Sequence, residues 1–192
     1  MKGVYIFLAD GFEDVEALGT HDVLRRGGVN VNLVSISDEP FVQSSHGLTV
    51  GVEQSIHDLE FNHAHTGPKD FFIFPGGMPG SRKLAACTPL ISEMKKHYAA
   101  GGSVAAICAA PGTVLSQLDG LEGVEFTCFD GFQEALEAKG AVFTPAPAVS
   151  CGRIITGRSA GHAIAFALQI LARIKGEETA AEVEYAMNLN TH

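Results

Sequence analysis

The chain has 192 residues, of which 46% are hydrophobic and 18% are charged, and this length suits one well-buried core rather than two. Its net charge of −9 and sequence pI of about 5.3 argue against nucleic acid or an anionic membrane as the main partner, because both select clustered Lys and Arg. We therefore expect one domain, residues 1–192, that binds a small molecule or another protein.

The first apolar run, GVYIFLA at 3–9, is too short for the hydrophobic region of a signal peptide or for a membrane span. We therefore expect the protein to stay in the cytoplasm. The cysteines lie about twenty residues apart and form no CxxC pair: Cys87, Cys108, Cys128 and Cys151. This spacing excludes a zinc knuckle and a compact disulfide framework, and it predicts free thiols in a reducing compartment.

In the first half of the chain, strand-length apolar runs alternate with longer amphipathic stretches. The pattern predicts, in order, a strand at 3–9, a helix at 13–28, a strand at 29–36, a hairpin at 40–53, a loop at 61–70, and a buried strand at 71–74 that runs into the glycine-rich turn 74–80. The first three elements form a βαβ unit, which favours a parallel sheet.

The second half continues the alternation. It predicts a helix at 88–102, a strand at 103–107, helices at 110–118 and 130–140, a turn and strand at 151–157, and a helix at 161–176. No repeat or low-complexity linker interrupts the chain. The expected fold class is α/β, with a mostly parallel sheet and helices on both of its faces.

Cys108 lies between the strand SVAAI and the helix that follows it. Such a turn points a side chain out of the carboxyl end of the sheet, where the free N–H groups of the helix face it. A helix N-terminus lowers a cysteine pKa into roughly the 3.5–7.5 range, so we expect a thiolate nucleophile. The alternative is a buried core cysteine without chemistry.

Two other segments end at the same edge of the sheet, ADGFEDVEA at 9–17 and FPGGMPG at 74–80. Gly76 and Gly77 let backbone N–H groups approach an anion closely, although a plain tight turn also explains them. Glu16, between Val15 and Ala17, is expected to point inward as a protonated acid that donates a hydrogen bond to the sulfur. The preceding acids of this segment are expected to be solvated.

Together, ADGFEDVEALGTHDVLRRGG, FPGGMPG, AAICAAP and TGRSAGHAIAFALQIL resemble the ThiJ/PfpI superfamily, and most of all its branch that contains the Parkinson-associated oxidative-stress protein and bacterial ThiJ-type relatives. The resemblance spans almost the whole chain. It implies a flavodoxin-like three-layer sandwich, a homodimer, Cys108 as nucleophile with Glu16 as its protonated neighbour, and an anion cradle formed by the backbone of Gly77 and Ala109.

The chain departs from the family pattern at several positions. Ala109 follows Cys108 where the peptidase-like branch has a histidine, so a cysteine peptidase is disfavoured. Cys128 stands where the favoured branch often has a pocket histidine, which leaves an altered acid–base step, a second redox thiol or simple packing open. His46 stands where that branch tends to have an anion-binding arginine, so anion affinity is expected to be weaker or pH-dependent.

Two functions follow from the resemblance. The first is a cofactor-free glyoxalase or deglycase that acts on 2-oxoaldehydes or glycated proteins through Cys108 and Glu16. The second is a non-enzymatic oxidative-stress sensor or chaperone that works by oxidation of the same thiol. His57, His63 and His65 lie in a polar stretch with solvent-facing spacing, so we predict no metal site there.

Overall fold

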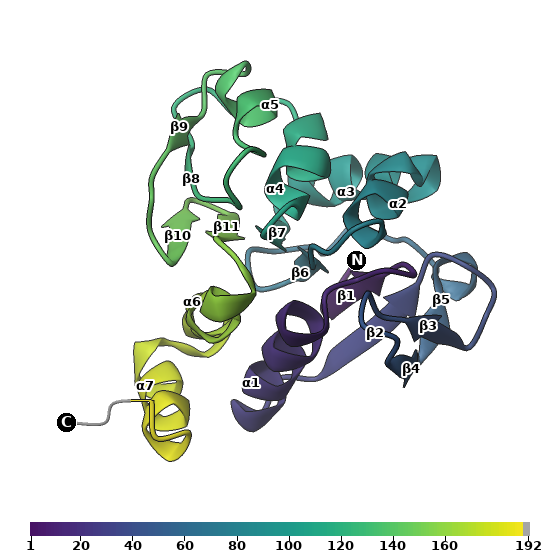
Figure 1. The fold of residues 1–192 in the computed structure, drawn as a ribbon, viewed down its shortest axis with the longest axis horizontal. Helices are drawn as coiled ribbons and strands as arrows, with labels where there is room; N and C mark the ends of the chain where they lie inside the picture. The colour runs from purple at the N-terminus through teal and green to yellow at the C-terminus, as the bar shows by residue number, and fades with distance from the viewer. Residues whose placement is uncertain (190–192) are drawn as a thin grey trace.

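The computed structural model describes residues 1–189, and it has three layers, a central sheet with helices on both faces (Figure 1). The sheet has seven strands in the order β10-β11-β7-β6-β1-β2-β5. Neighbouring strands run parallel except for β10 and β11, which form an antiparallel hairpin at one edge. The predicted flavodoxin-like α/β sandwich is confirmed.

The parallel strands are apolar because both faces of the sheet are covered. They are β1 (Val4–Leu8), β2 (Val31–Ser35), β6 (Phe71–Phe74), β7 (Ser103–Ile107) and β11 (Ile154–Gly157), with β5 (Gln54–Ser55) and β10 (Ala148–Cys151) at the edges. Every residue of β6 and β7 is buried. Alternate side chains of each strand enter the two hydrophobic cores on opposite faces of the sheet.

One face is covered by η1 (Val15–Gly19), α1 (Thr20–Arg26) and α6 (Ala163–Lys175), which follows the short turn η4 (Ala160–His162). The helix α7 (Glu177–Ala186) packs on α6. The other face is covered by α2 (Gly80–Ala86), α3 (Thr88–Ala99), α4 (Ala110–Thr113) and η3 (Leu115–Gln117). Figure 1 shows the two groups on either side of the strands.

Smaller elements lie outside the main sheet. The predicted hairpin is present as β3 (Phe41–Gln43) paired with β4 (Thr49–Gly51), followed by the turn η2 (Ile56–Asp58). A second small sheet joins β8 (Glu125–Phe126) to β9 (Val142–Phe143), with α5 (Glu134–Glu137) between them in the chain. Among residues 1–189, every helix is too short or too polar to cross a membrane.

Several helix predictions need correction. The helix expected at 13–28 begins as a wide π-helical turn, η1, before it becomes α1. The helix expected at 110–118 is divided into α4 and the 3-10 turn η3, and the helix expected at 130–140 is limited to the four residues of α5. The sequence analysis missed α2 and α7, since neither has a strong apolar stripe.

Candidate active site

The carboxyl ends of β1, β6 and β7 meet at one edge of the sheet. In the sheet, β2 lies on one side of β1, whereas β6 and β7 lie on its other side. The strand order therefore reverses direction between β1 and β6, which makes this edge a topological switch point. Open α/β sheets bind ligands at such points. Glu16, Gly76 and Cys108 follow these three strands and come together here, as the sequence predicts.

Cys108 has an unusual backbone. Its φ is +64°, the left-handed region that a residue with a side chain rarely adopts. Its N–H donates to the carbonyl of Gly157 (3.0 Å), and its carbonyl accepts from the N–H of Phe129 (2.9 Å). These bonds hold a sharp turn directly after β7, and Cys108 is half-buried there.

Glu16 is held beside the thiol. Its side chain is only 1% exposed, and Oε2 accepts the N–H of Gly76 at 2.8 Å. The other oxygen, Oε1, is buried and has no hydrogen-bond partner in the described part of the chain, and the Cys108 side chain lies beside the carboxyl group. A Cβ on Gly76 would lie 2.7 Å from Oε2 and 2.8 Å from Cβ of Cys108, so only glycine lets the pair meet.

The pKa values of the pair differ from the expectation. Burial raises the pKa of Glu16 to about 7. Burial, followed by the negative charge and hydrogen bond of Glu16, raises the pKa of Cys108 to about 12. The predicted lowering by a helix N-terminus is wrong, because α4 has only four residues and its effect is smaller than that of burial and the nearby carboxylate.

The protonation of the two groups is coupled. The negative charge of Glu16 is one cause of the raised thiol pKa, and this cause disappears once the carboxyl takes up a proton. A carboxylate with a pKa near 7 is well matched to accept a thiol proton at neutral pH. The arrangement thus places a thiol beside a carboxyl group whose pKa lies near neutral pH.

Two backbone N–H groups face the sulfur. Those of Ala109 and Gly77 form hydrogen bonds that lower the pKa of Cys108, in opposition to burial. Gly77 has φ +86°, and a Cβ there would lie 2.5 Å from the nitrogen of Glu13. Gly76, predicted to belong to the same cradle, instead uses its N–H to hold Glu16.

Cys128 is fully buried and packs in the core with Phe126 and Leu136. Burial raises the pKa of its thiol to about 12. Of the three roles left open by the sequence, its surroundings favour packing. The structure has all four cysteines as free thiols.

His46 lies on the β3–β4 turn and joins the segment after β1. Its Nδ1 lies 2.6 Å from Oδ2 of Asp14, and Ser44 donates to Oδ1 of the same carboxylate at 2.6 Å. One polar side-chain atom from each of Glu13, Asp14 and His46 lies within 4.8 Å of the others. The sequence analysis selected His46 but missed this contact with the two acids. The hydrogen bonds among these side chains explain why they lie close together, and we assign no metal to this cluster.

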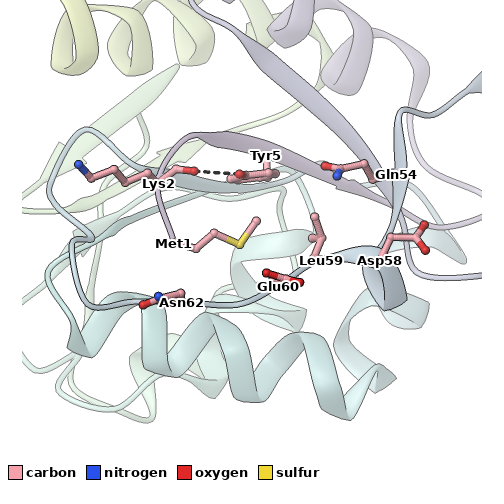
Figure 2. Close-up of a pocket in the computed structure, with 8 residues that line it drawn as sticks. All are labelled: Met1, Lys2, Tyr5, Gln54, Asp58, Leu59, Glu60 and Asn62. Atoms are coloured by element: carbon pink, nitrogen blue, oxygen red, sulfur yellow. Dashed lines mark hydrogen bonds between the residues drawn. The ribbon is translucent and has the colours of Figure 1, made fainter.

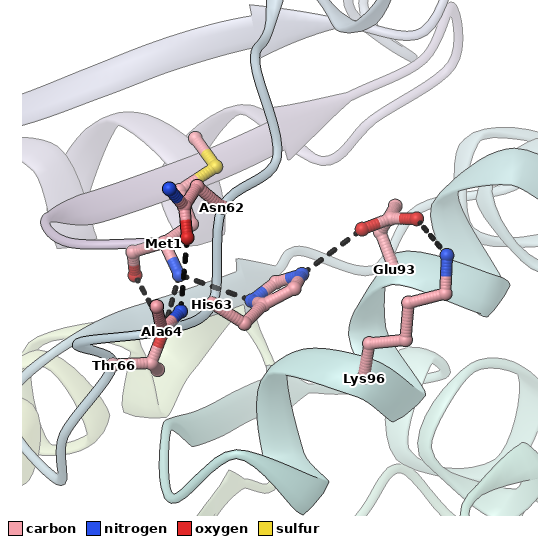
Figure 3. A network of polar contacts seen from close by, with 7 residues as sticks. All are labelled: Met1, Asn62, His63, Ala64, Thr66, Glu93 and Lys96. Atoms are coloured by element: carbon pink, nitrogen blue, oxygen red, sulfur yellow. Dashed lines mark hydrogen bonds and ion pairs between the residues drawn. The ribbon is translucent and has the colours of Figure 1, made fainter.

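Of the three histidines at 57–65, His57 and His65 are exposed as expected, whereas His63 is partly buried and has partners of its own. The Met1 amine donates to Nδ1 of His63 (3.0 Å), whose Nε2 lies 2.9 Å from a Glu93 oxygen, and Lys96 contacts the other oxygen (Figure 3). His57 instead lies 3.9 Å from Asp38.

A cavity of about 450 Å³ lies away from the thiol. Figure 2 shows its lining side chains, which come from the start of β1 and from residues 54–62. Because β1 and β7 run in the same direction, this cavity is at the amino end of the sheet and Cys108 is at the carboxyl end. Its polar lining includes Lys2, Asp58 and Glu60, and it contains no thiol.

Comparisons with known proteins agree with this architecture. A sequence model described as the DJ-1/PfpI family matches residues 2–173. The Arabidopsis thaliana protein DJ-1 homolog B is 33% identical over 182 residues, which cover 95% of this chain and 40% of that protein. The Caenorhabditis elegans glutathione-independent glyoxalase DJR-1.2 is 33% identical over 167 residues, covering 86% of this chain and 84% of the relative.

Among solved structures, oxidised Toxoplasma gondii DJ-1 has a TM-score of 0.87 and 27% identity, and the match covers 100% of both chains. The chain spans less than half the length of the Arabidopsis relatives, of which it covers 40% and 45%.

Proposed function

The chain belongs to the DJ-1/PfpI family, and from this premise we propose that it is a cysteine-dependent, cofactor-free glyoxalase or deglycase. Its substrates would be reactive 2-oxoaldehydes, such as methylglyoxal, or the early adducts they form on proteins. One relative is named a glutathione-independent glyoxalase, which supports this class of activity. The observation that carries the proposal is that the buried Glu16 carboxyl and the Cys108 side chain lie side by side at Gly76.

The first step uses both groups. The sulfur of Cys108 bonds to the aldehyde carbon, the π electrons move to the carbonyl oxygen, and the thiol proton passes to the Glu16 carboxylate. Glu16 then gives this proton to the oxygen, which completes a hemithioacetal. The N–H groups of Gly77 and Ala109, which lie at the sulfur, favour negative charge in this region during attack.

The second step moves hydrogen between the two carbons. Glu16 removes the proton from the former aldehyde carbon, whose electron pair forms a C=C bond while the ketone π electrons move to the ketone oxygen and give an enediolate. The hydroxyl proton of the former aldehyde carbon passes to this oxygen, and the Glu16 carboxyl returns its proton to the neighbouring carbon. The product is a thioester of lactate on Cys108. Water attacks its carbonyl carbon, the C–S bond breaks and the sulfur regains its proton. The sum is methylglyoxal plus water to lactate, so the thiol and carboxyl suffice without a cofactor.

The test is lactate formation from methylglyoxal. We expect turnover by the wild type and by Cys151→Ala, which removes a partly exposed thiol outside the site, and loss of turnover in Cys108→Ala. Chiral analysis of the lactate identifies the stereochemistry. Production by the wild type no faster than by Cys108→Ala would refute the proposal.

A second candidate function is oxidation sensing by the same thiol. The N–H groups of Gly77 and Ala109, together with protonated Glu16, can hold the oxygens of a sulfinic acid on Cys108. The Toxoplasma relative was solved in an oxidised form, which supports this alternative. After peroxide treatment, peptide mass analysis distinguishes oxygen addition confined to Cys108 from general oxidation of the four cysteines.

We also propose that the protein is a cytoplasmic homodimer, as the family resemblance implies. Analytical ultracentrifugation at micromolar concentration tests the oligomeric state directly. Fractionation of the cells that make the protein tests its location.

A further inference from the structure

A rim of three charged side chains lies beside the thiol site. We use the word rim for Glu13, Asp14 and His46, whose side-chain polar atoms approach one another within 4.8 Å. The two acids come from the segment between β1 and η1, while His46 comes from the turn between β3 and β4. The rim therefore joins two parts of the chain that are about 30 residues apart.

The rim is in direct contact with the anion cradle. The N–H of Glu13 donates to the carbonyl of Gly76 at 3.1 Å, and the site of a Cβ on Gly77 would be 2.5 Å from that nitrogen. Gly77 in turn points its N–H at the sulfur of Cys108. The carboxylate of Glu13 also accepts the N–H of Glu16 at 2.8 Å. A charge on the rim is therefore close to any ligand carried on the sulfur.

The net charge of the rim is negative and depends on one titrating group. Burial raises the pKa of Asp14, but the hydrogen bonds from Ser44 and His46 together outweigh burial and keep that pKa below the ordinary value. The charged groups that act on His46 are Asp14 and Glu13, and both raise its pKa. Its side chain is 71% exposed, so it exchanges protons freely with solvent. With both acids ionised, protonation of the imidazole changes the rim from two negative charges to one.

We propose that the rim selects substrates of the Cys108 site by charge, favouring uncharged carbonyl compounds over carboxylate-bearing ones and relaxing this preference when His46 is protonated. The inference deepens the proposed function and rests on the same thiol. Like charges repel, and the repulsion is weakened by solvent and salt. The charge of Glu13 already acts on the site, because it raises the pKa of the Glu16 carboxyl beside the sulfur. Glu13 and Asp14 act here as specificity-determining groups rather than as solvated acids of a helix start.

Alkylation of Cys108 tests the proposal without any need for turnover. Iodoacetamide and iodoacetate are nearly the same size and differ in charge. Peptide mass analysis gives the rate of each at Cys108 with EDTA present. We expect Glu13→Gln and Asp14→Asn to lower the amide-to-acetate rate ratio by about threefold to tenfold relative to wild type at pH 8 and low salt. The matched control is Glu182→Gln on α7, which removes an equal charge near the far end of α1.

Salt and pH separate a charge effect from a change of shape. In 1 M salt the ratios of wild type and rim variants should converge, because the Debye length falls to about 3 Å. In the wild type the ratio should fall as pH decreases, and His46→Ala should reduce the size of that fall. The part that remains in His46→Ala comes from Glu16, whose pKa is about 7. Equal ratios in wild type, Glu13→Gln and Asp14→Asn at low salt would overturn the proposal, as would a difference that persists unchanged in 1 M salt.

The same comparison applies to turnover. Glyoxylate carries an aldehyde and a carboxylate but no ketone, so it can form the hemithioacetal on Cys108 without turnover and acts as an inhibitor. The inhibition constant of glyoxylate should fall relative to the KM for methylglyoxal in the rim variants. If no variant or wild type forms product, the proposed enzymatic function fails, while the alkylation ratios still decide whether the rim discriminates by charge.

Discussion

Replacing Glu16 by Gln should stabilise the folded protein at neutral and alkaline pH while it removes the activity. The carboxyl has a pKa of about 7 in the folded state against an ordinary value of 4.5, because it is buried. One pKa unit corresponds to about 1.4 kcal/mol, so ionised Glu16 costs the folded state about 3 kcal/mol. Gln has nearly the same shape, keeps an oxygen for the N–H of Gly76 and carries no charge.

The direction of the pH dependence follows from the raised pKa. The folded state binds the Glu16 proton more tightly than the unfolded state does, so this contribution to stability is complete below about pH 4.5. It falls as pH rises and is lost above about pH 7. The Gln variant has no such proton, and its advantage over wild type should grow from near zero at pH 4.5 to about 3 kcal/mol at pH 8.

Urea unfolding of both proteins at several pH values between about 4.5 and 8.5 measures this difference. Other titrating groups contribute to both proteins, so they largely cancel in the comparison. Glu182→Gln serves again as the control for removal of one exposed acid, and its curve should stay parallel to that of wild type. A Glu16→Gln advantage that does not change with pH would show that the carboxyl is not buried in its charged form as described.

Three further outcomes are expected. Gly76→Ala should destabilise the protein by about 1–3 kcal/mol and slow alkylation of Cys108, because its Cβ would enter the space between the thiol and Glu16. Gly161→Ala is the control and should be nearly neutral, because a Cβ there meets open space. Equal urea midpoints for the two variants would contradict this prediction. Burial lowers the pKa of His97 from 6.5 to about 4, and the Nε2 of the neutral ring donates to the carbonyls of Asp70 and Ser103. Because the unfolded state binds a proton at this histidine more tightly than the folded state, wild type should lose about 3 kcal/mol of stability as pH falls from 6.5 to 4. His97→Gln should flatten that part of the stability curve, and an unchanged slope would count against the assignment. Cys128→Ala should cost about 1 kcal/mol of stability for the lost packing and leave lactate formation within twofold of wild type; a large loss of turnover at full stability would instead point to a chemical role.

The arrangement of the site was predictable because it depends on sheet direction. Strands that run parallel end at one edge, so the residues after β1, β6 and β7 had to lie near one another whatever the details of packing. Cys108, Glu16 and Gly77 were located by that rule and by the motifs around them. The extent to which the site is buried was not predictable from the sequence. Burial has a larger effect on the thiol pKa than the N-terminus of the four-residue helix α4.

Contacts between distant segments were also beyond the sequence. The hydrogen bond from the N–H of Gly76 to Glu16 joins residues 60 positions apart, and the contact between Asp14 and His46 joins residues 32 positions apart. Neither leaves a local pattern, because each depends on how a turn is placed against another strand end. The same reason explains α2 and α7, whose positions come from packing on neighbouring helices rather than from a strong periodicity of their own.

The left-handed backbone of Cys108 has a consequence for how this protein would respond to laboratory evolution. Glycine adopts that conformation without the penalty of about 1–2 kcal/mol that other residues incur, and glutamine in place of Glu16 removes a buried charge. A library screened only for survival at high temperature should therefore enrich glycine at 108 and glutamine at 16. Selection for heat resistance alone would therefore replace both residues of the reactive centre. The thiol and the carboxyl are retained only where their chemistry is also under selection.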